Sequence, residues 1–295
     1  MKLIEPNTAL LDRVNGDAEL QGLTVESLGA RYEEISARFH SHFTVDQAHQ
    51  HENALFHKIR YLELLSRPWR GRILDVGNDK PFLTYFLRAL NPDASFNVIS
   101  NEIPESPFPL HEVDIEIEAF PFEEGTFDGV IFTEVVEHLW RNPSWCVAEM
   151  NRVLKQGATA FVTTPNACDR HSLVCILWQA NLNQRSGYYA TLESGHLHLW
   201  TVELLSNLFK AHGFTITAAE TKNLYGHTKP DANIEEFIAR ISPYAALMNE
   251  AIVIEATKSS PIAAAVYPPE IFPDQRPVQF QGAIVGFAER AMRKD

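Results

Sequence analysis

The chain has 295 residues, a formal net charge of −13 and a hydrophobic content of 45%. This length allows one large α/β domain or two smaller ones, and the acidic balance lacks the basic surface that nucleic-acid binding requires, so we expect no nucleic-acid partner. The number and spacing of the three cysteines fit neither a disulfide framework nor a zinc cluster, which favours a reducing compartment. The opening residues lack the apolar core of a signal peptide and no stretch is long enough to span a membrane, so the sequence predicts a cytoplasmic protein without an integral membrane segment.

Residues 1–70 are rich in helix-forming residues and predict a helical cap. The tract from Asn53 to Leu65 spaces its apolar residues at mostly helical intervals, which indicates an amphipathic helix lying on a core. The cap also carries many histidines. They could be metal ligands or substrate contacts, but histidines on a solvated helix face are the more common case.

Residues 72–91 follow the pattern of a strand, a tight turn and a helix. Ile73 to Val76 indicate a short buried strand, Gly77 begins the turn, and Pro81 suits the first turn of a helix that Asn78 or Asp79 would cap. The backbone N–H groups of such a turn can hold a polar ligand. A second strand, from Phe96 to Ser100, is followed by Glu102, an acidic residue placed to accept hydrogen bonds from the ribose of a nucleoside.

The stretch from Phe120 to Leu139 combines a buried strand with a group of polar side chains. After the apolar run Val130 to Phe132 the period changes, which predicts a helix that carries Glu134, Glu137 and His138 at positions i, i+3 and i+4 of one face. Because ligands of open α/β sheets bind at the carboxyl ends of the strands, we expect these side chains to line a site.

The remaining sequence alternates between helical and strand patterns. It predicts helices over 143–154, 201–212 and 231–248, and strands over 158–163, 214–219 and 251–256. Residues at about 169–200 look like an insertion that covers the site. The pattern of the proline-rich tail, 259–295, predicts a final helix over 282–294 that would dock on the body or on a second subunit, with a membrane surface as the alternative.

Five segments together resemble the class I S-adenosylmethionine-dependent methyltransferases, in particular those with type 11 or type 23 signatures. In chain order they are FPFEEGTFD followed by EVVEHL, EMNRVLKQGA, TTPN, and HLHLWTVELLSNLFKAHGF, and the match runs from Arg72 to Lys258. The resemblance implies a Rossmann-like three-layer αβα sandwich over residues 71–258. Its seven-stranded sheet is mostly parallel, with the last strand antiparallel, and the cap precedes it.

The resemblance also implies that S-adenosylmethionine is the methyl donor and S-adenosylhomocysteine the product. The loop after the first strand departs from the family pattern, because Asp79 and Pro81 stand where further glycines are usual; Lys80 would pair with the donor's carboxylate. Glu102 matches the ribose acid, and Asp114 and Ile115 match the pair that holds adenine. The residues expected to bind the donor are Asp75, Gly77, Asn78, Lys80, Glu102, Asp114, Ile115, Thr133 and Glu134.

Methyl transfer to a hydroxyl needs a base, and His138, His196 and His198 are the candidates near the carboxyl edge. The alternative role of His196 and His198 is to anchor the helix that begins near Thr201. A further alternative comes from small-RNA 2′-O-methyltransferases and some ubiquinone-pathway O-methyltransferases, which hold a divalent metal with a similar pattern. The matching residues here are Glu134, Glu137 and His138, with His196 or His198.

We expect the acceptor to be a hydroxyl on a sugar, a glycan precursor or a related small molecule, because Trp178, Tyr188 and Tyr189 in the insertion could stack on its ring. The rival hypothesis is a catalytically silent methyltransferase-like binding or scaffold protein, which the altered donor loop favours. The sequence also allows a homo-oligomer formed through the tail.

Overall fold

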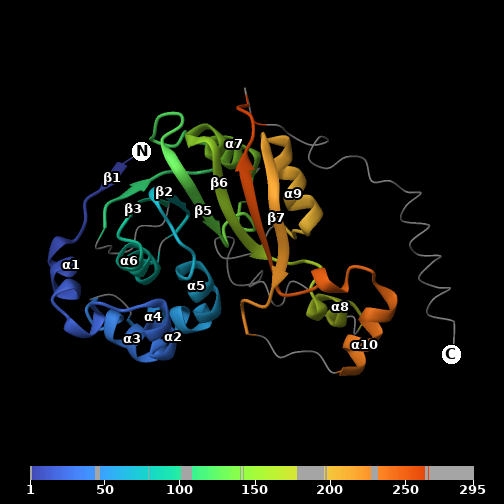
Figure 1. Ribbon diagram of the computed structural model, residues 1–295, viewed down its shortest axis with the longest axis horizontal. Coiled ribbons are helices and arrows are strands. Elements are labelled where there is room, and N and C mark those ends of the chain that lie inside the picture. Colours follow the sequence, from blue (N-terminus) through green and yellow to red (C-terminus); the bar gives the residue numbers. More distant parts are fainter. Residues whose placement is uncertain are drawn as a thin grey trace.

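The computed structural model in Figure 1 describes residues 2–43, 47–78, 80–100, 108–139, 141, 143–177, 196, 198–226, 232–262 and 265. A single mixed sheet runs through the centre. Its strands are β1 (Lys2–Ile4), β2 (Gly71–Val76), β3 (Ala94–Ser100), β4 (Leu110–Glu112), β5 (Phe127–Thr133), β6 (Leu154–Pro165), β7 (Phe214–Lys222) and β8 (Ala251–Lys258). Their order is β1-β4-β3-β2-β5-β6-β8-β7.

The predicted sheet is confirmed, with one added edge strand. From β4 to β6 neighbouring strands are parallel, and β8 is antiparallel to both β6 and β7. These seven strands form the expected mostly parallel sheet whose last strand in sequence, β8, is antiparallel. The strand β1 was not predicted. It pairs antiparallel with β4, with Lys2 opposite Glu112, and so covers the edge that β4 would otherwise expose.

Helices cover both faces of the sheet, as the three-layer expectation requires. Side chains alternate between the faces of a strand, so Leu74 and Val130 face the layer of α7 (Pro143–Val153) and α9 (Val202–Ala211). Ile73 and Ile131 pack on the opposite side, in a second cluster with α6 (Pro81–Leu90) and the N-terminal helices. Figure 1 shows these two helical layers on either side of the strands.

The predicted N-terminal helical cap is confirmed as part of the fold. It contains α1 (Thr8–Asn15), α2 (Val25–Ala30), α3 (Tyr32–His40), α4 (Gln47–Phe56) and α5 (Lys58–Leu65). Aromatic rings join the cap to α6: Phe39 lies edge-on to Phe82, with ring centroids 5.4 Å apart. The cap and the sheet therefore share one apolar core. The division at residues 70 and 258 stays a prediction.

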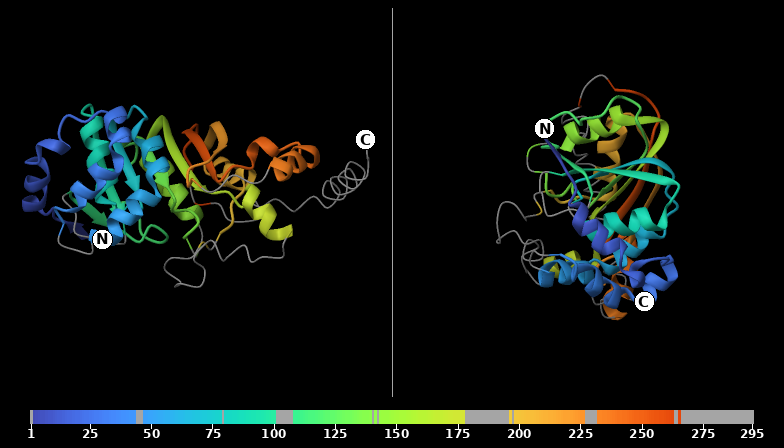
Figure 2. Two further views of the ribbon diagram at one scale, coloured as in Figure 1. Left: turned by 90° about the horizontal axis from the view of Figure 1, so that it is seen from below. Right: turned by 90° about the vertical axis from the view of Figure 1, so that its left-hand side faces the viewer.

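Several predicted helices are found with small shifts of their ends. Thr201 caps α9 through a hydrogen bond from the Leu204 N–H, as its position suggested. The helix expected over 231–248 is shorter, because α10 (Ala232–Ile241) ends before a 3-10 turn at Ala245–Leu247. The helix α8 (Arg170–Leu177) lies at the start of the segment predicted as an insertion, and that role stays a prediction. Figure 2 shows α8 and α10 at the end of the molecule opposite the N-terminal helices.

Three local predictions were wrong. Residues 134–139 form a turn and no helix, because Glu134 has a left-handed backbone with φ of 58° and its N–H donates to the Thr163 carbonyl. The single helix expected over 53–65 is divided at His57 into α4 and α5. The N-cap of α6 is Lys80, without a side-chain cap, because Asn78 accepts from the Lys80 N–H instead.

Some predicted features lie outside the described residues. They are Asp79, Glu102, the aromatic residues Trp178, Tyr188 and Tyr189, and the tail helix over 282–294. Among the helices that the structure does describe, none has both the length and the apolar character needed to cross a membrane.

Candidate active site

The parallel strands bring the predicted site residues to one edge of the sheet. The strands β4, β3, β2, β5 and β6 run in the same direction, so their carboxyl ends meet. The donor loop follows β2, Asp114 and Ile115 follow β4, and Glu134 follows β5. The edge therefore collects most of the polar side chains that the sequence singled out.

The donor loop is held together by its own side chains. Asp75 is buried, and its carboxylate accepts a hydrogen bond of 2.6 Å from the Asn78 side-chain amide. The same amide donates to Thr84 over 3.1 Å, while the Asn78 carbonyl oxygen accepts from the Lys80 N–H over 2.8 Å. Asn78 thus connects the end of β2 to the start of α6.

Gly77 lets this loop pass close to the turn after β5. Its φ of 80° lies in the left-handed region, and a Cβ placed there would lie 2.6 Å from a methyl group of Val135. The predicted donor loop and the turn that carries His138 are therefore in direct contact.

The predicted adenine pair lies after β4. The Asp114 carboxylate accepts from the Glu116 N–H over 3.1 Å and lies 3.3 Å from Arg141 Nη1, with both side chains partly exposed. Ile115 is 6% exposed and belongs to the core. An exposed carboxylate beside a buried apolar side chain is compatible with the predicted pair, although its third partner, Glu102, lies outside the described residues.

Glu134 is fixed by three neighbours from distant parts of the chain. Its carboxylate accepts from the Thr163 hydroxyl over 2.8 Å and from the Tyr225 hydroxyl over 2.5 Å, and it lies 3.4 Å from Arg60 Nη1. Thr133, the residue before it, is half-buried at the end of β5. Glu134 thus faces the cap helix α5 and the segment after β7.

Glu137 is a buried carboxylate that is only half satisfied. Its Oε2 accepts from the Thr164 hydroxyl over 2.8 Å, whereas Oε1 has no hydrogen-bond partner among the residues that the structure describes. The nearest imidazole nitrogen, His138 Nε2, lies 3.9 Å away. Burial raises the pKa of Glu137 to about 7.

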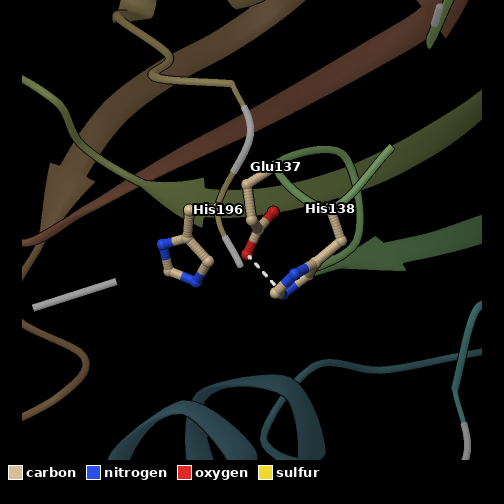
Figure 3. A group of neighbouring side chains, drawn as sticks. All are labelled: Glu137, His138 and His196. Carbon is tan, nitrogen blue, oxygen red and sulfur yellow. Dashed lines mark ion pairs between the residues drawn. The ribbon is translucent and has the colours of Figure 1, made fainter. Parts of the chain in front are cut away.

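The histidines gather around Glu137. His196 meets His138 edge-on, with ring centroids 4.9 Å apart, and Figure 3 shows that it comes from a separate segment. Burial, and then the neighbouring His138, lower the pKa of His196 to about 4, so its ring is neutral at pH 7. His198 donates its backbone N–H to the Glu137 carbonyl over 3.2 Å, and burial lowers the pKa of its ring.

The segment that carries His196 and His198 is attached to the end of β6. Trp200 forms a bridge with Asn166, and its carbonyl accepts from the Ala167 N–H over 2.8 Å. This attachment holds the segment that precedes α9, in which the His196 ring offers a nitrogen within 4.8 Å of a Glu137 carboxylate oxygen.

Three of the residues predicted as possible metal ligands lie close together. Ligand atoms of Glu137, His138 and His196 all lie within 4.8 Å of one another. Glu134 is not in this group, because its oxygens face Thr163, Tyr225 and Arg60.

Two residues of the site were missed by the sequence analysis. Arg60 stands four residues before buried Leu64, so its place on the apolar face of α5 was a signal that could have been used. Tyr225 carries no such signal, because its contact with Glu134 joins residues 91 positions apart.

Comparisons with known proteins agree with this fold. The family described as methyltransferase domain, of type 23, matches residues 47–219, which is more than half of the chain. A search of curated proteins finds no match.

Solved structures similar to this chain are distant in sequence. A methyltransferase in complex with the Trm112 methyltransferase activator of Haloferax volcanii has 12% identity and a TM-score of 0.51, over 76% of this chain and 98% of that one. An S-adenosylmethionine-dependent methyltransferase from Archaeoglobus fulgidus has 16% identity and a TM-score of 0.48, over 70% of this chain and 94% of that one. At 12% identity the first of these two structures supports the fold alone. The family match and the strand order together show that the chain belongs to the class I S-adenosylmethionine-dependent methyltransferases.

Proposed function

We propose that the protein transfers a methyl group from S-adenosylmethionine to a hydroxyl of a sugar, a glycan precursor or a related small molecule. The observation that carries the proposal is the contact between Gly77 and Val135. It sets the donor loop against the turn that presents His138, so a bound donor and a base would share one edge of the sheet.

The residues at this edge suit the donor. S-adenosylmethionine, when bound, supplies a methyl group on an electrophilic sulfonium. Gly77 lets the donor loop pass close to Val135 of the turn after β5, and Asp114 and Ile115 offer a carboxylate and a backbone to the adenine of the donor. Holding two reactants in line is the main contribution that such a site makes to methyl transfer.

His138 is the base that the geometry favours. Glu137 lies 3.9 Å from its Nε2, and an ionised carboxylate there would stabilise the imidazolium that forms when the acceptor hydroxyl loses its proton. His196 is neutral at pH 7 and can orient the acceptor or share the proton. His198 stays a third candidate, because it lies on the same segment as His196.

Calorimetry with S-adenosylmethionine and S-adenosylhomocysteine tests the donor, and an acceptor screen read by the mass of one added methyl group tests the reaction. We expect His138→Ala and His196→Ala to slow turnover by about 10²–10⁴-fold with little change in donor affinity. His42→Ala, in the cap beside Asp17, is the control. If neither nucleoside binds, the scaffold hypothesis holds; two fully active variants would refute the base assignment.

A metal-assisted version of the same reaction is the second candidate, favoured by the unpartnered Glu137 Oε1. Glu137, His138 and His196 would hold the ion, and their mixture of carboxylate and imidazole suits Mg²⁺, Mn²⁺ or Zn²⁺. The ion would supply a positive charge that lowers the pKa of an acceptor hydroxyl.

Metal content after dialysis and thermal unfolding with added Mn²⁺ or Zn²⁺ test this candidate. Glu137→Gln should abolish any metal-dependent rise in the melting temperature, and Glu134→Gln, which leaves the three ligands in place, should preserve it. The metal-free mechanism would be favoured if the protein retains no metal, is not stabilised by added metal and is unaffected by a chelator.

A further inference from the structure

Two residues of the cap carry buried polar atoms that the fold leaves unpaired. They are the Asn53 Oδ1 and His57 Nδ1 atoms, and neither has a hydrogen-bond partner within the residues that the structure describes. Buried polar groups are nearly always hydrogen-bonded, because an unpaired one costs free energy. Two such atoms on residues one helical turn apart therefore indicate a place for a ligand.

Both residues lie on the stripe of the cap that faces the candidate active site. The His57 N–H donates to the Asn53 carbonyl over 3.0 Å, and the Tyr61 N–H donates to the His57 carbonyl over 2.9 Å, so helical hydrogen bonding continues from α4 into α5. Asn53, His57 and Arg60 consequently stand at i, i+4 and i+7 of one helical face. Arg60 lies 3.4 Å from Glu134 at the end of β5, which places this face over the carboxyl edge of the sheet.

The charges that His57 senses place it near the donor loop as well. Burial, and then the charges of Arg60 and Lys80, lower the pKa of His57 to about 2, so its ring is neutral at pH 7. Lys80 ends the donor loop at the start of α6. The imidazole therefore lies close to both the cap helix α5 and the donor loop.

The two unpaired atoms fit a neutral ligand that carries a hydroxyl. The Asn53 Oδ1 atom only accepts, so its partner must donate, which excludes a carboxylate or a fully ionised phosphate. An ammonium donates, but the positive charges of Arg60 and Lys80 would repel it. A hydroxyl is neutral, and it can donate to the Asn53 oxygen while it accepts from His57 Nδ1–H, one of the two neutral tautomers of the ring.

An exposed aromatic ring borders the same position. Phe56 is 57% exposed and meets the His57 ring edge-on, with ring centroids 4.8 Å apart. A few polar groups beside an apolar wall are the usual composition of a small-molecule pocket, and the C–H face of a sugar ring suits such a wall. Asn53 and His57 are half-buried, so rotation about their own side-chain torsions can turn the two atoms toward a ligand at this wall.

We propose that Asn53 and His57 bind a second hydroxyl of the acceptor, one that is not methylated, while the acceptor's ring lies against Phe56. This inference rests on the proposed function and deepens it, because it names the cap residues that select a polyhydroxylated acceptor. Asn53 and His57 hold the acceptor and take no part in the transfer of the methyl group.

Thermal unfolding without ligand tests whether the two atoms are unpaired. Asn53→Leu and His57→Phe keep the size of the side chains and should leave the melting temperature unchanged or raise it, because each removes an unpaired polar group. Asn91→Leu is the matched control. The buried Asn91 amide donates to the Leu87 carbonyl and accepts from the Trp69 N–H, both over 2.9 Å, so its loss should lower the melting temperature by roughly 2–10 °C. Equal losses in all three variants would overturn the inference.

Steady-state kinetics tests the role in acceptor binding. The probes are the methyl glycosides of glucose, mannose, galactose and rhamnose, and the added methyl group is detected by mass. For a glycoside that the wild type methylates, Asn53→Leu and His57→Phe should raise KM about tenfold and change kcat less than about threefold, with the affinity for S-adenosylhomocysteine unchanged. His42→Ala, in the cap beside Asp17, is the control and should change none of these values.

Monodeoxy forms of the methylated glycoside identify the hydroxyl that is bound. One of them should raise the KM of the wild type as much as Asn53→Leu does and cause no further loss in that variant, because the same contact can be lost only once. An unchanged KM in both variants, or losses that add for every deoxy form, would overturn the inference and leave the methyltransferase activity established. A wild type that binds the donor but methylates none of the glycosides would overturn the sugar acceptor of the proposed function together with this inference.

Discussion

The donor loop and the turn over residues 134–139, here called the histidine turn, lie against each other but differ in how their polar groups are satisfied. In the donor loop, Asn78 satisfies the buried Asp75 carboxylate and joins it to Thr84 and the Lys80 N–H. In the turn after β5 and in the segment beside it that precedes α9, buried polar atoms stay open: Glu137 Oε1 and His198 Nε2 have no partner within the described ranges.

The two regions therefore differ in how much hydrogen-bonding capacity they leave for a ligand. Buried polar groups are normally hydrogen-bonded, and each exception calls for an explanation. A loop whose side chains satisfy one another keeps a fixed shape before the donor arrives. A carboxylate and an imidazole with open positions, Glu137 and His198, have hydrogen-bonding capacity that an acceptor or an ion can use. We therefore propose that the donor loop fixes the position of the donor and that the histidine turn supplies the reactive groups.

The largest effect should come from the point where the two regions touch. Gly77→Ala adds a Cβ 2.6 Å from Val135 to a backbone that disfavours L side chains, so we expect a loss of roughly 2–5 kcal/mol in the free energy of unfolding. Gly125→Ala is the control, because Gly125 has a φ of 64° but nothing within 4 Å of the added Cβ. Chemical denaturation should show a loss of only about 1–2 kcal/mol for this control.

The double variant Gly77→Ala/Val135→Ala separates the cost of the contact with Val135 from the cost of a side chain on a left-handed backbone. Removing the Val135 methyl groups should make the added Cβ less damaging than it is in the parent background. If Gly77→Ala and Gly125→Ala cost the same, the close approach of the donor loop to the histidine turn does not matter for stability.

The next effect concerns the pH dependence of stability. The pKa of Glu137 is raised in the folded state from 4.5 to about 7, so its contribution to stability is full below pH 4.5 and is lost as pH rises toward 7 and beyond. The loss should amount to about 3 kcal/mol, since each pKa unit corresponds to about 1.4 kcal/mol. Glu137→Gln keeps the acceptor for Thr164 and should remove this loss.

The measurement is the free energy of unfolding from pH 4 to pH 9 in wild type and Glu137→Gln. His196 acts in the opposite direction, because its pKa is lowered to about 4 and its contribution is lost as pH falls through 6.5 toward 4. Since both proteins contain His196, the difference between the two curves isolates Glu137. Parallel curves would show that the Glu137 carboxylate is satisfied in solution.

The sequence predicted the sheet better than the site, because the two depend on different information. Apolar runs such as Val130 to Phe132 and the ordered family segments establish strands and their order from local pattern. The edge strand β1 has three residues, and its conformation comes from pairing with β4. A pattern that short carries too little information to be recognised.

The turn at 134–139 shows how tertiary contacts override local pattern. Glu134, Glu137 and His138 have helical spacing, but the Glu134 N–H bonds to the Thr163 carbonyl, and its carboxylate bonds to Thr163 and Tyr225. These partners lie in distant parts of the sequence, so local periodicity could not reveal them. The histidines were still identified, because residue type and family order placed them at the correct edge.

The smallest effect tests whether the donor loop is as self-contained as its hydrogen bonds indicate. Asn78→Ala removes the donors to Asp75 and Thr84, so a buried carboxylate loses a partner, and we expect a loss of about 1–3 kcal/mol in the free energy of unfolding. Thr84→Val, which removes only the second of these partners, should cost less. Calorimetry with S-adenosylhomocysteine and with 5′-methylthioadenosine, which lacks the amino-acid end, then separates shape from contact. If Asn78 only fixes the loop, its loss weakens both ligands by the same factor. A loss confined to S-adenosylhomocysteine would instead place Asn78 at the amino-acid end of the donor, and Asn78 would then be a residue that contacts the donor and not only one that shapes the loop.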